Sequence, residues 1–320
     1  MANVETTHPS RSLKELQEQF GTEEACKAYL TKLRFAHGVF CPRCACTERV
    51  YALKARPHHW VCKNCAPNGY RFSVLTGTIF ENTNIPLRTW FQVVYLMCQS
   101  KKGISALQVW RMMEPVRGKR GSYRTAWYMC HRIRAAMMDE NGPLGGIVEV
   151  DETYIGGSDR NRHKGKKSID VRKKQQKSEY RKPGESVGFL KVGVIGAIAR
   201  KGNVVARVIG SLDAPTKQEF VRRLVGKGKF KMLFTDKDHA YRYVQRGLHH
   251  EAVDHSRGEY VRGLVHTNTI ESFWSLLKRG VMGSFHHVSK EYLPLYLQEF
   301  TFRFNQRKNR DIFERVLAGC

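Results

Sequence analysis

Four cysteines in two close pairs place the strongest constraint on how this chain can fold. The first pair is Cys41 and Cys44, the second is Cys62 and Cys65, and seventeen residues separate the two pairs. Each Cys-x-x-Cys turn aims two thiolates at one point, so two turns can complete the tetrahedral sulfur shell that suits Zn²⁺. The spacing predicts a zinc ribbon, in which the metal holds the fold and takes no part in catalysis.

The other five cysteines are not expected to bind this metal. Cys46 lies near the first pair but outside both turns, and the rest are scattered as small buried thiols often are: Cys26, Cys98, Cys130 and Cys320. The first eleven residues are polar and hold no apolar signal-peptide core. Nine cysteines in such a chain favour a reducing compartment over a disulfide-bonded protein, so we expect a cytoplasmic protein.

The charge of the chain points to a polyanionic partner. Its 320 residues include 55 Lys and Arg against 29 Asp and Glu, a formal charge of +26. Nucleic acid is the first candidate partner and an anionic membrane surface the second. No stretch approaches the ~20 consecutive apolar residues of a membrane span, which disfavours the membrane. With 11% aromatic and 41% hydrophobic residues, global disorder is excluded as well. We expect a soluble protein that associates with the nucleoid when it binds DNA.

The pattern of apolar residues predicts an N-terminal helical segment (residues 1–38), the ribbon (39–82), a helical region (83–140) and an α/β domain (145–310). Helices are predicted at 22–38, 86–100, 104–113, 123–138, 215–225, 240–244, 267–281 and 292–304. Strands are predicted at 147–155, 189–199, 204–209 and 230–234. This order is typical of a mixed α/β layer fold.

Two basic regions are candidate DNA contacts. Helices 104–113 and 123–138 could form a helix-turn-helix whose second helix presents basic and aromatic side chains to DNA: Tyr123, Arg124, His131, Arg132 and Arg134. The alternative is an ordinary helical pair with a solvated basic face, since the connector exceeds the usual turn. Segment 158–187 carries eleven Lys and Arg and four Asp and Glu. We interpret it as an insertion that is disordered or ordered by DNA, the alternative being a solvated loop without a partner.

Three carboxylates could converge on a divalent cation. Asp151 lies inside a β-prone run, Asp236 ends an apolar strand, and Glu271 lies in the first turn of a helix, 34 residues beyond Asp236. Two strands and a helix can bring such groups to one edge of a sheet, where oxygen ligands suit Mg²⁺ or Mn²⁺. Two such ions can activate a water or a DNA 3′-hydroxyl for in-line phosphoryl displacement.

Neighbouring acids compete with the first two of these carboxylates. Glu149 shares the strand face of Asp151, whereas Glu152 lies on the opposite face. Asp238 competes with Asp236, and Asp236 could instead cap the helix that follows it.

The helical carboxylate has a structural alternative too. Glu271 could be the N3 acid of a capping box with Asn268 as N-cap, a role compatible with metal binding. Lys278 follows seven residues later on the same helix face, where it can contact a phosphate or simply face solvent.

These motifs resemble those of DDE-type insertion-sequence transposases, specifically the zinc-ribbon ISXO-type family. The resemblance covers most of residues 20–310 and rests on segments 41–44, 71–78, 86–90, 100–106, 148–157 (VEVDETYIGG) and 266–279 (HTNTIESFWSLLKR). It implies a ribonuclease-H-like domain in which Asp151, Asp236 and Glu271 bind Mg²⁺ or Mn²⁺ and Lys278 is the accompanying basic residue.

The implied reaction is cleavage of DNA at element ends followed by strand transfer into target DNA. The resemblance implies that the protein binds double-stranded DNA, namely the terminal inverted repeats of the element and the target duplex. It also implies that copies of the chain assemble as a homodimer or a larger assembly. Two alternatives remain open: an inactive or regulatory zinc-ribbon DNA-binding protein, and a ribonuclease-H-like nuclease.

Overall fold

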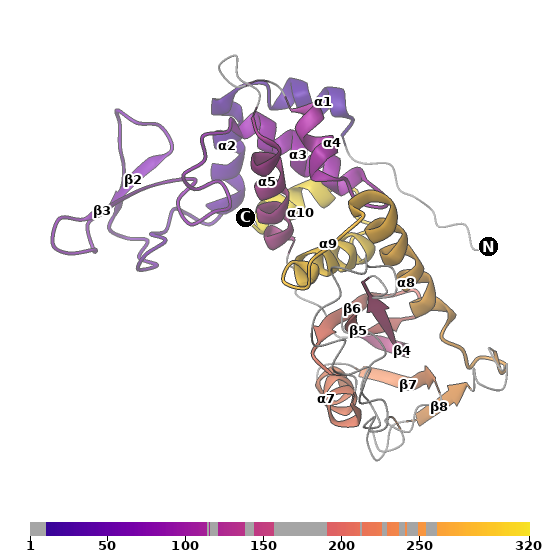
Figure 1. Ribbon diagram of the computed structural model, residues 1–320. Coiled ribbons are helices and arrows are strands. Elements are labelled where there is room, and N and C mark those ends of the chain that lie inside the picture. The colour runs from indigo at the N-terminus through magenta and orange to yellow at the C-terminus, as the bar shows by residue number, and fades with distance from the viewer. Residues whose placement is uncertain are drawn as a thin grey trace, which may run out of the picture. The chain divides into compact units, whose positions relative to one another are not determined.

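The computed structural model describes residues 11–113, 115, 121–137, 144–156, 191–211, 213–225, 229–236, 241, 249–253 and 261–320. The basic segment 158–187, Asp238 and, apart from Tyr241, the short helix predicted at 240–244 lie outside these residues. The chain divides into two compact units, Met1–Met138 with Gln306–Cys320, and Asp139–Asn305 (Figure 1). No helix in the described ranges combines the length and the apolar character needed to cross a membrane.

The first unit is built mainly of helices. They are α1 (Leu13–Gln19), α2 (Glu23–Arg34), α3 (Leu87–Gln99), α4 (Ala106–Met112), α5 (Tyr123–Ala136) and α10 (Ile312–Ala318). Ser or Thr side chains cap four of these helices by accepting a backbone N–H: Ser12, Thr22, Ser105 and Ser122. The predictions of α2 to α5 are confirmed, whereas α1 and α10, each of seven residues, were not predicted.

A cluster of aromatic rings forms the core between these helices. The ring of Phe20 lies 4.9 Å from that of Phe91 on α3, measured between centroids. Phe313 on α10 lies 5.7 Å from Phe91 and 5.9 Å from Phe20. The last helix of the chain therefore completes a core whose other members come from the first hundred residues.

The zinc-ribbon region forms a small antiparallel sheet. Its strands are β1 (Val50–Ala52), β2 (His59–Cys62) and β3 (Tyr70–Ser73), in the order β1-β2-β3. Trp60 and Phe72, at paired positions of β2 and β3, stack with ring centroids 5.8 Å apart. Because so short a sheet has little core of its own, the metal is expected to supply much of its stability.

The second unit contains a five-stranded mixed sheet. The strands are β4 (Gly145–Ile155), β5 (Val192–Ala199), β6 (Val204–Ile209), β7 (Lys229–Asp236) and β8 (His249–Val253), in the order β6-β5-β4-β7-β8. Strand β4 is antiparallel to β5 and parallel to β7; β5 and β6 are antiparallel, and β7 and β8 parallel. The mixed α/β prediction is confirmed, and β8, whose sequence HHEAV is polar, is an additional strand.

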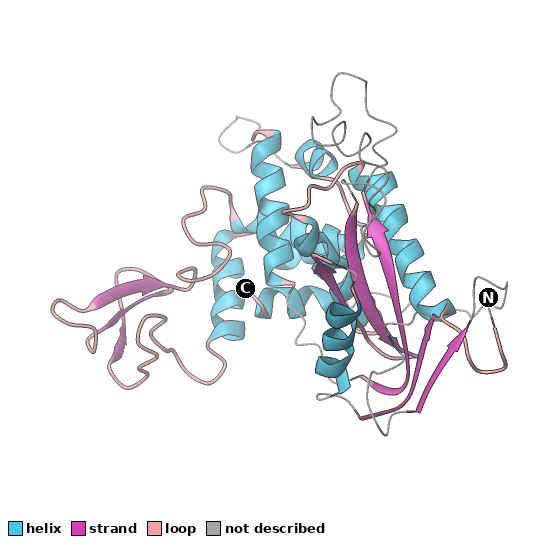
Figure 2. Ribbon diagram, turned by 60° about the horizontal axis from the view of Figure 1, so that its bottom comes forward, coloured by secondary structure: helices cyan, strands magenta, loops and turns pink. Residues whose placement is uncertain are grey.

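Helices cover both faces of this sheet (Figure 2). Helix α7 (Ala214–Val225) packs through Phe220 and Val221 against Val148 and Val150 of β4. Helices α8 (Asn268–Gly280) and α9 (Leu293–Asn305) cover the other face, and α8 runs into a π-helical turn at Val281–Phe285. Since side chains alternate along a strand, each face of β4 meets its own set of helices.

Candidate functional site

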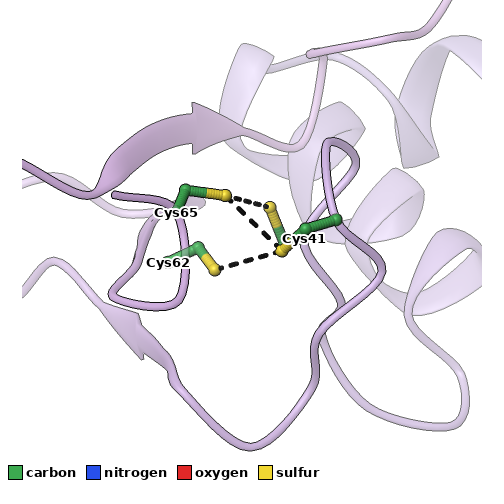
Figure 3. A group of neighbouring side chains, drawn as sticks. Cys41, Cys62 and Cys65 are labelled. Carbon is green, nitrogen blue, oxygen red and sulfur yellow. Dashed lines mark hydrogen bonds between the residues drawn. The ribbon is translucent and has the colours of Figure 1, made fainter. Parts of the chain in front are cut away.

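The two Cys-x-x-Cys turns come together as predicted. Cys41, Cys44, Cys62 and Cys65 place their sulfur atoms within 4.8 Å of one another, and Cys46 is not part of the group. Figure 3 shows Cys41, Cys62 and Cys65 turned toward one another. Individual Sγ–Sγ distances are 3.8 Å for Cys41–Cys65, 3.6 Å for Cys44–Cys62 and 3.5 Å for Cys44–Cys65. A tetrahedral zinc with Zn–S bonds of about 2.3 Å needs sulfur atoms about 3.8 Å apart. The cluster therefore fits a structural Zn²⁺.

The chemistry of the thiols also calls for a cation. Burial and, to a smaller extent, the neighbouring thiols together raise the pKa of Cys65 to about 12. Zinc binds cysteine as the thiolate, so a bound ion would offset the cost of crowding deprotonated sulfur atoms.

In the second unit, the register of the sheet brings two of the predicted carboxylates to neighbouring strands. Val150 of β4 pairs with Thr235 of β7, and the next residues along these parallel strands are Asp151 and Asp236. Paired positions of adjacent strands project to the same face and lie about 4.8 Å apart. Both carboxylates are half-buried, as expected of groups at the mouth of a site.

The competing acids beside Asp151 have other partners. On the α7 face, Glu152 accepts a hydrogen bond from the Tyr241 hydroxyl and lies 3.1 Å from the Nζ of Lys217. On the α8 face, Glu149 is fully buried and is held by Arg200, with 2.7 Å between Nε and Oε1. Neither acid is placed to replace Asp151.

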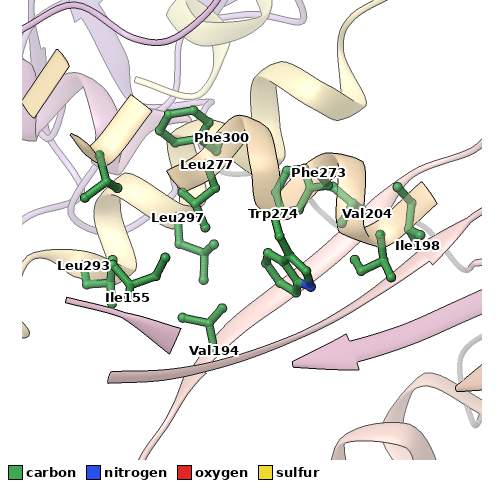
Figure 4. Close-up of a cluster of buried hydrophobic side chains, with 12 residues drawn as sticks. Ile155, Val194, Ile198, Val204, Phe273, Trp274, Leu277, Leu293, Leu297 and Phe300 are labelled. Atoms are coloured by element: carbon green, nitrogen blue, oxygen red, sulfur yellow. The ribbon is translucent and has the colours of Figure 1, made fainter. Parts of the chain in front are cut away.

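A tryptophan from α8 holds the Asp151 carboxylate. The indole Nε1 of Trp274 donates a hydrogen bond of 3.1 Å to Oδ2 of Asp151. Figure 4 shows Trp274 reaching from α8 toward the strands. Gly196, paired with Asp151 across β4 and β5, makes room for the indole, because a Cβ there would lie 2.6 Å from Cη2 of Trp274.

Helix α8 carries the remaining two predicted residues. Glu271 lies in its first turn, where its Oε1 accepts a 2.9 Å hydrogen bond from the hydroxyl of Thr267. Lys278 lies two turns further along, and both Glu271 and Lys278 are exposed. The capping box with Asn268 is wrong, because the N-cap is Thr267 and its side chain accepts from no backbone N–H of the helix. The capping carboxylate comes instead from Glu149 on β4.

The electrostatics of Asp151 link it to the other two acids. Its pKa is raised to about 7, first by burial and then by the negative charge of Glu152, with further contributions from Glu271 and Asp236. Carboxylates that repel one another in this way are typical of cation sites, where the ion restores the charge balance. Within the described ranges, however, the four cysteines are the only group of ligand atoms already close enough to share one ion.

One expectation for the helical region is corrected. His131 and Arg134, predicted to face DNA, are only 6% and 1% exposed. The reason is that α5 packs against α3, α4 and α10, so that most of its circumference is covered. Tyr123 and Arg124 at its N-terminus are exposed, while Arg132 is half-buried and donates to the backbone carbonyls of Thr78 and Glu81.

Sequence reasoning missed the donors that surround the carboxylates. Nothing in the sequence identified Arg200 as the donor to Glu149, because a turn after β5 places it there. Nor did it identify Gly196 as the residue that leaves space for Trp274, because only the strand register pairs it with Asp151. The spacing of Glu271 and Trp274, three residues apart on one helix, was the available signal, since such residues are neighbours on a helix surface.

Comparisons with known proteins agree with this architecture. Residues 143–305, just over half of the chain, match the ISXO2-like transposase domain, and residues 21–68 match the transposase zinc-ribbon domain. The chain is also 27% identical, over 305 residues, to an uncharacterised protein in transposable element ISH50 of Halobacterium salinarum. That similarity covers 92% of this chain and 93% of the relative.

Proposed function

Since the chain belongs to the family of ISXO2-like transposases, we propose that it cuts DNA at the ends of an insertion sequence and joins those ends to target DNA. The proposed catalytic domain is ribonuclease-H-like and is built on the five-stranded sheet, with three antiparallel strands and two further parallel ones. Asp151, Asp236 and Glu271 are its proposed metal ligands. The observation that carries this assignment is the pairing of β4 with β7, which puts Asp151 and Asp236 at neighbouring positions.

The donor set suits Mg²⁺ or Mn²⁺, which take carboxylate oxygens as ligands. When bound, such ions lower the pKa of a bound water and stabilise charge on the attacking and leaving oxygens of a phosphoryl transfer. Glu271 is exposed in the first turn of α8, where its Oε1 accepts from the hydroxyl of Thr267, and it is proposed as the third ligand beside the two strand carboxylates. Trp274 orients Asp151 through its indole N–H, and Lys278, exposed two turns beyond Glu271 on α8, is proposed to contact a DNA phosphate.

Two displacements account for the proposed activity. In the first, the oxygen of a water molecule bonds to phosphorus at the element end and the water loses a proton. The P–O3′ bond breaks and O3′ gains a proton, which leaves a free 3′-hydroxyl on the element and a 5′-phosphate on the flanking strand. In the second, that 3′-hydroxyl loses its proton and attacks a target phosphate, forming a new phosphodiester and releasing a target 3′-hydroxyl. Both are in-line substitutions at phosphorus and need no oxidant or energy-rich cofactor.

DNA binding is proposed to use the basic surface of the molecule. A charge of +26 favours contact with phosphates, and Tyr123 and Arg124 are exposed at the start of α5. Zinc would hold the ribbon in shape without taking part in the chemistry. Because two element ends must be joined to one target, the proposed active form is a dimer or larger assembly.

The function is tested with oligonucleotide duplexes that carry the terminal repeats of the element from which the gene comes. Wild-type protein is expected to nick these ends and join them to a target plasmid in Mg²⁺ or Mn²⁺. Asp151→Asn should bind the same DNA and lose cutting, because an amide oxygen carries no charge for the cation. Glu219→Gln on α7, a half-buried acid paired with Arg222 and Arg223, is the control and should cut normally.

Two results would overturn the proposal in favour of an alternative. If wild-type protein binds DNA but neither it nor Asp151→Asn cuts, the chain is a regulatory or inactive DNA-binding protein. If it cuts RNA–DNA hybrids or unrelated duplexes as well as the terminal repeats, it is a nuclease without end specificity.

A further inference from the structure

Glu149 is a fully buried carboxylate that belongs to no proposed ligand set. It lies on β4, two residues before Asp151 and on the same face, with an exposed fraction of 0%. Its Oε1 accepts from Nε of Arg200 at 2.7 Å and from the hydroxyl of Thr269 at 2.9 Å, and it lies 3.3 Å from Nδ1 of His266. Its Oε2 accepts from the backbone N–H groups of Thr269 at 2.8 Å and Ile270 at 3.1 Å.

These four hydrogen bonds use the acceptor capacity of the carboxylate. An ionised carboxylate offers about four lone-pair positions, so Glu149 has none left for a cation. Its partners instead identify it as the N-terminal cap of α8, because Thr269 and Ile270 belong to the first turn of that helix. The first N–H groups of a helix need an acceptor and attract negative charge, and here the acceptor comes from a strand more than a hundred residues earlier.

Arg200 ties the same carboxylate to the rest of the sheet. Its Nη2 donates to the carbonyl of His266 at 3.1 Å, just before α8 begins, and its guanidinium lies 4.9 Å from the ring centroid of Phe234 on β7. The backbone N–H of Arg200 donates to Ile147 of β4 at 2.9 Å. One buried ion pair therefore connects β4, β7 and the start of α8, the three elements that carry Asp151, Asp236 and Glu271.

We propose that Glu149 is a positioning residue that fixes the first turn of α8 against β4, so that Glu271 is held facing Asp151 and Asp236. The proposal rests on the function proposed above, because it assigns Glu149 a role toward the same cation. Glu271 directly follows Ile270, whose N–H is bound by Glu149. A shift of this turn therefore moves Glu271 relative to the strands, whereas a change elsewhere in the core does not.

The test is the binding of Mn²⁺ to the full-length, zinc-loaded protein, measured by titration calorimetry. In Glu149→Gln, an NH₂ group replaces one oxygen. Wherever that group lies, either the bond from Nε of Arg200 or the bonds from the backbone N–H groups of α8 are lost, even if Nδ1 of His266 accepts from the amide. We expect Mn²⁺ affinity to fall by about 10- to 100-fold, the usual cost of losing a group that orients metal ligands. Thermal denaturation of the same samples confirms that the variant is folded at the temperature of titration.

Glu299→Gln is the matched control. Glu299 is also fully buried in the second unit and pairs with an arginine, Nη2 of Arg303, at 3.4 Å, but it lies on α9, which carries none of the three proposed cation ligands. Loss of its charge should lower the melting temperature while leaving Mn²⁺ affinity and the rate of end cleavage unchanged. A structural role alone for Glu149 would give the same pattern in both variants.

A gentler pair of substitutions serves if Glu149→Gln does not fold. Thr269→Val removes the hydroxyl that donates to Glu149 and keeps the shape of the side chain, so we expect Mn²⁺ affinity to fall by about 2- to 10-fold. Thr269→Ser retains the hydroxyl and should restore wild-type affinity.

The outcomes separate this inference from the proposed function. If wild-type protein and Asp151→Asn take up Mn²⁺ equally, the proposed metal centre is wrong and the role of Glu149 falls with it. If wild-type protein binds Mn²⁺ and Asp151→Asn does not, but Glu149→Gln or Thr269→Val binds as well as wild type, the metal centre stands and Glu149 is only a structural residue.

Discussion

A glycine on β5, Gly196, allows the contact that positions the proposed catalytic carboxylate of Asp151. Gly196 pairs with Asp151 across two strands, and the space above it holds the indole of Trp274, which donates to Asp151. Any larger residue at this position would compete with the indole for the same volume. The position of an acid on β4 thus depends on a glycine on β5 and an aromatic residue on α8.

Gly196→Ala is expected to destabilise the protein by about 1–3 kcal/mol, because the new Cβ would overlap the buried indole and force it to shift. Denaturant titration followed by circular dichroism measures this loss. Gly210→Ala is the control, since nothing lies within 4 Å of a Cβ at that exposed position. Equal stability of the two variants would contradict the packing role of Gly196.

Trp274→Phe separates the hydrogen bond from the packing. Phe keeps an aromatic ring on α8 but has no N–H for Asp151, and it lacks the Cζ2 and Cη2 atoms that lie over Gly196. We therefore expect the substitution to lower the affinity for Mn²⁺ more than it lowers the free energy of unfolding. If the free energy of unfolding falls and the affinity for Mn²⁺ does not, the indole serves mainly to fill the hydrophobic core.

At the scale of elements, one asparagine joins the end of α9 to the edge of the sheet. Asn305 accepts from the backbone N–H of Val204 at 2.7 Å through Oδ1 and donates to the carbonyl of Val204 at 2.9 Å through Nδ2. In this way the amide imitates the two hydrogen bonds of a neighbouring strand, at the start of the edge strand β6. It covers backbone groups that an edge strand otherwise exposes.

Asn305→Ala should lower the free energy of unfolding by about 1–3 kcal/mol, because it leaves the N–H and the carbonyl of Val204 without these partners. Asn305→Asp should also be destabilising, since it keeps the acceptor but replaces the donor with a second acceptor facing a carbonyl. Chemical denaturation measures both. Hydrogen exchange of the Val204 amide gives an independent readout, and unchanged protection in the alanine variant would refute the edge-pairing role.

At the scale of the whole molecule, the two compact units depend on different sources of stability. The first combines a helical core with a ribbon whose four cysteines fit a structural zinc ion, and the second has a hydrophobic core on each face of its sheet. It follows that removal of metal should affect one part of the chain and spare another.

A strong chelator is expected to remove one zinc per chain and to expose the region from Cys41 to Ser73 to protease, while the five-stranded sheet stays protected. The reason is that binding of structural zinc is coupled to folding of small ribbons. Metal analysis and limited proteolysis measure the two effects. Cys44→Ser should reproduce the effect of chelation and Cys46→Ser should retain zinc; loss of zinc from both would contradict the ligand set.

The helical core depends on the other end of the chain. Phe313 is 4% exposed and its ring contacts those of Phe20, Phe91 and Tyr95. Phe313→Ala should destabilise the first unit by about 3–5 kcal/mol, the usual cost of truncating a buried phenylalanine. Leu107→Ala, at an exposed leucine of the same unit, is the control for thermal unfolding, and equal melting of the two variants would disprove the role of the C-terminal helix.

The sequence by itself determined the features that rest on neighbouring residues. The spacing of Cys41, Cys44, Cys62 and Cys65 predicted the metal cluster, because a tight turn fixes the direction of two side chains without help from the rest of the fold. Alternation along β4 likewise separated Glu149 and Asp151 from Glu152, since the period of a strand is a local property. The ends of most long helices followed from the same kind of pattern.

Only the tertiary structure decided which distant groups meet. It buried His131 and Arg134, which a helical pattern alone had placed toward DNA, because three other helices pack around α5. It also turned Glu149 from a rival metal ligand into the cap of a helix that begins at Asn268. Such contacts join residues more than a hundred positions apart, and their partners are fixed by sheet register and helix packing, which no local spacing encodes.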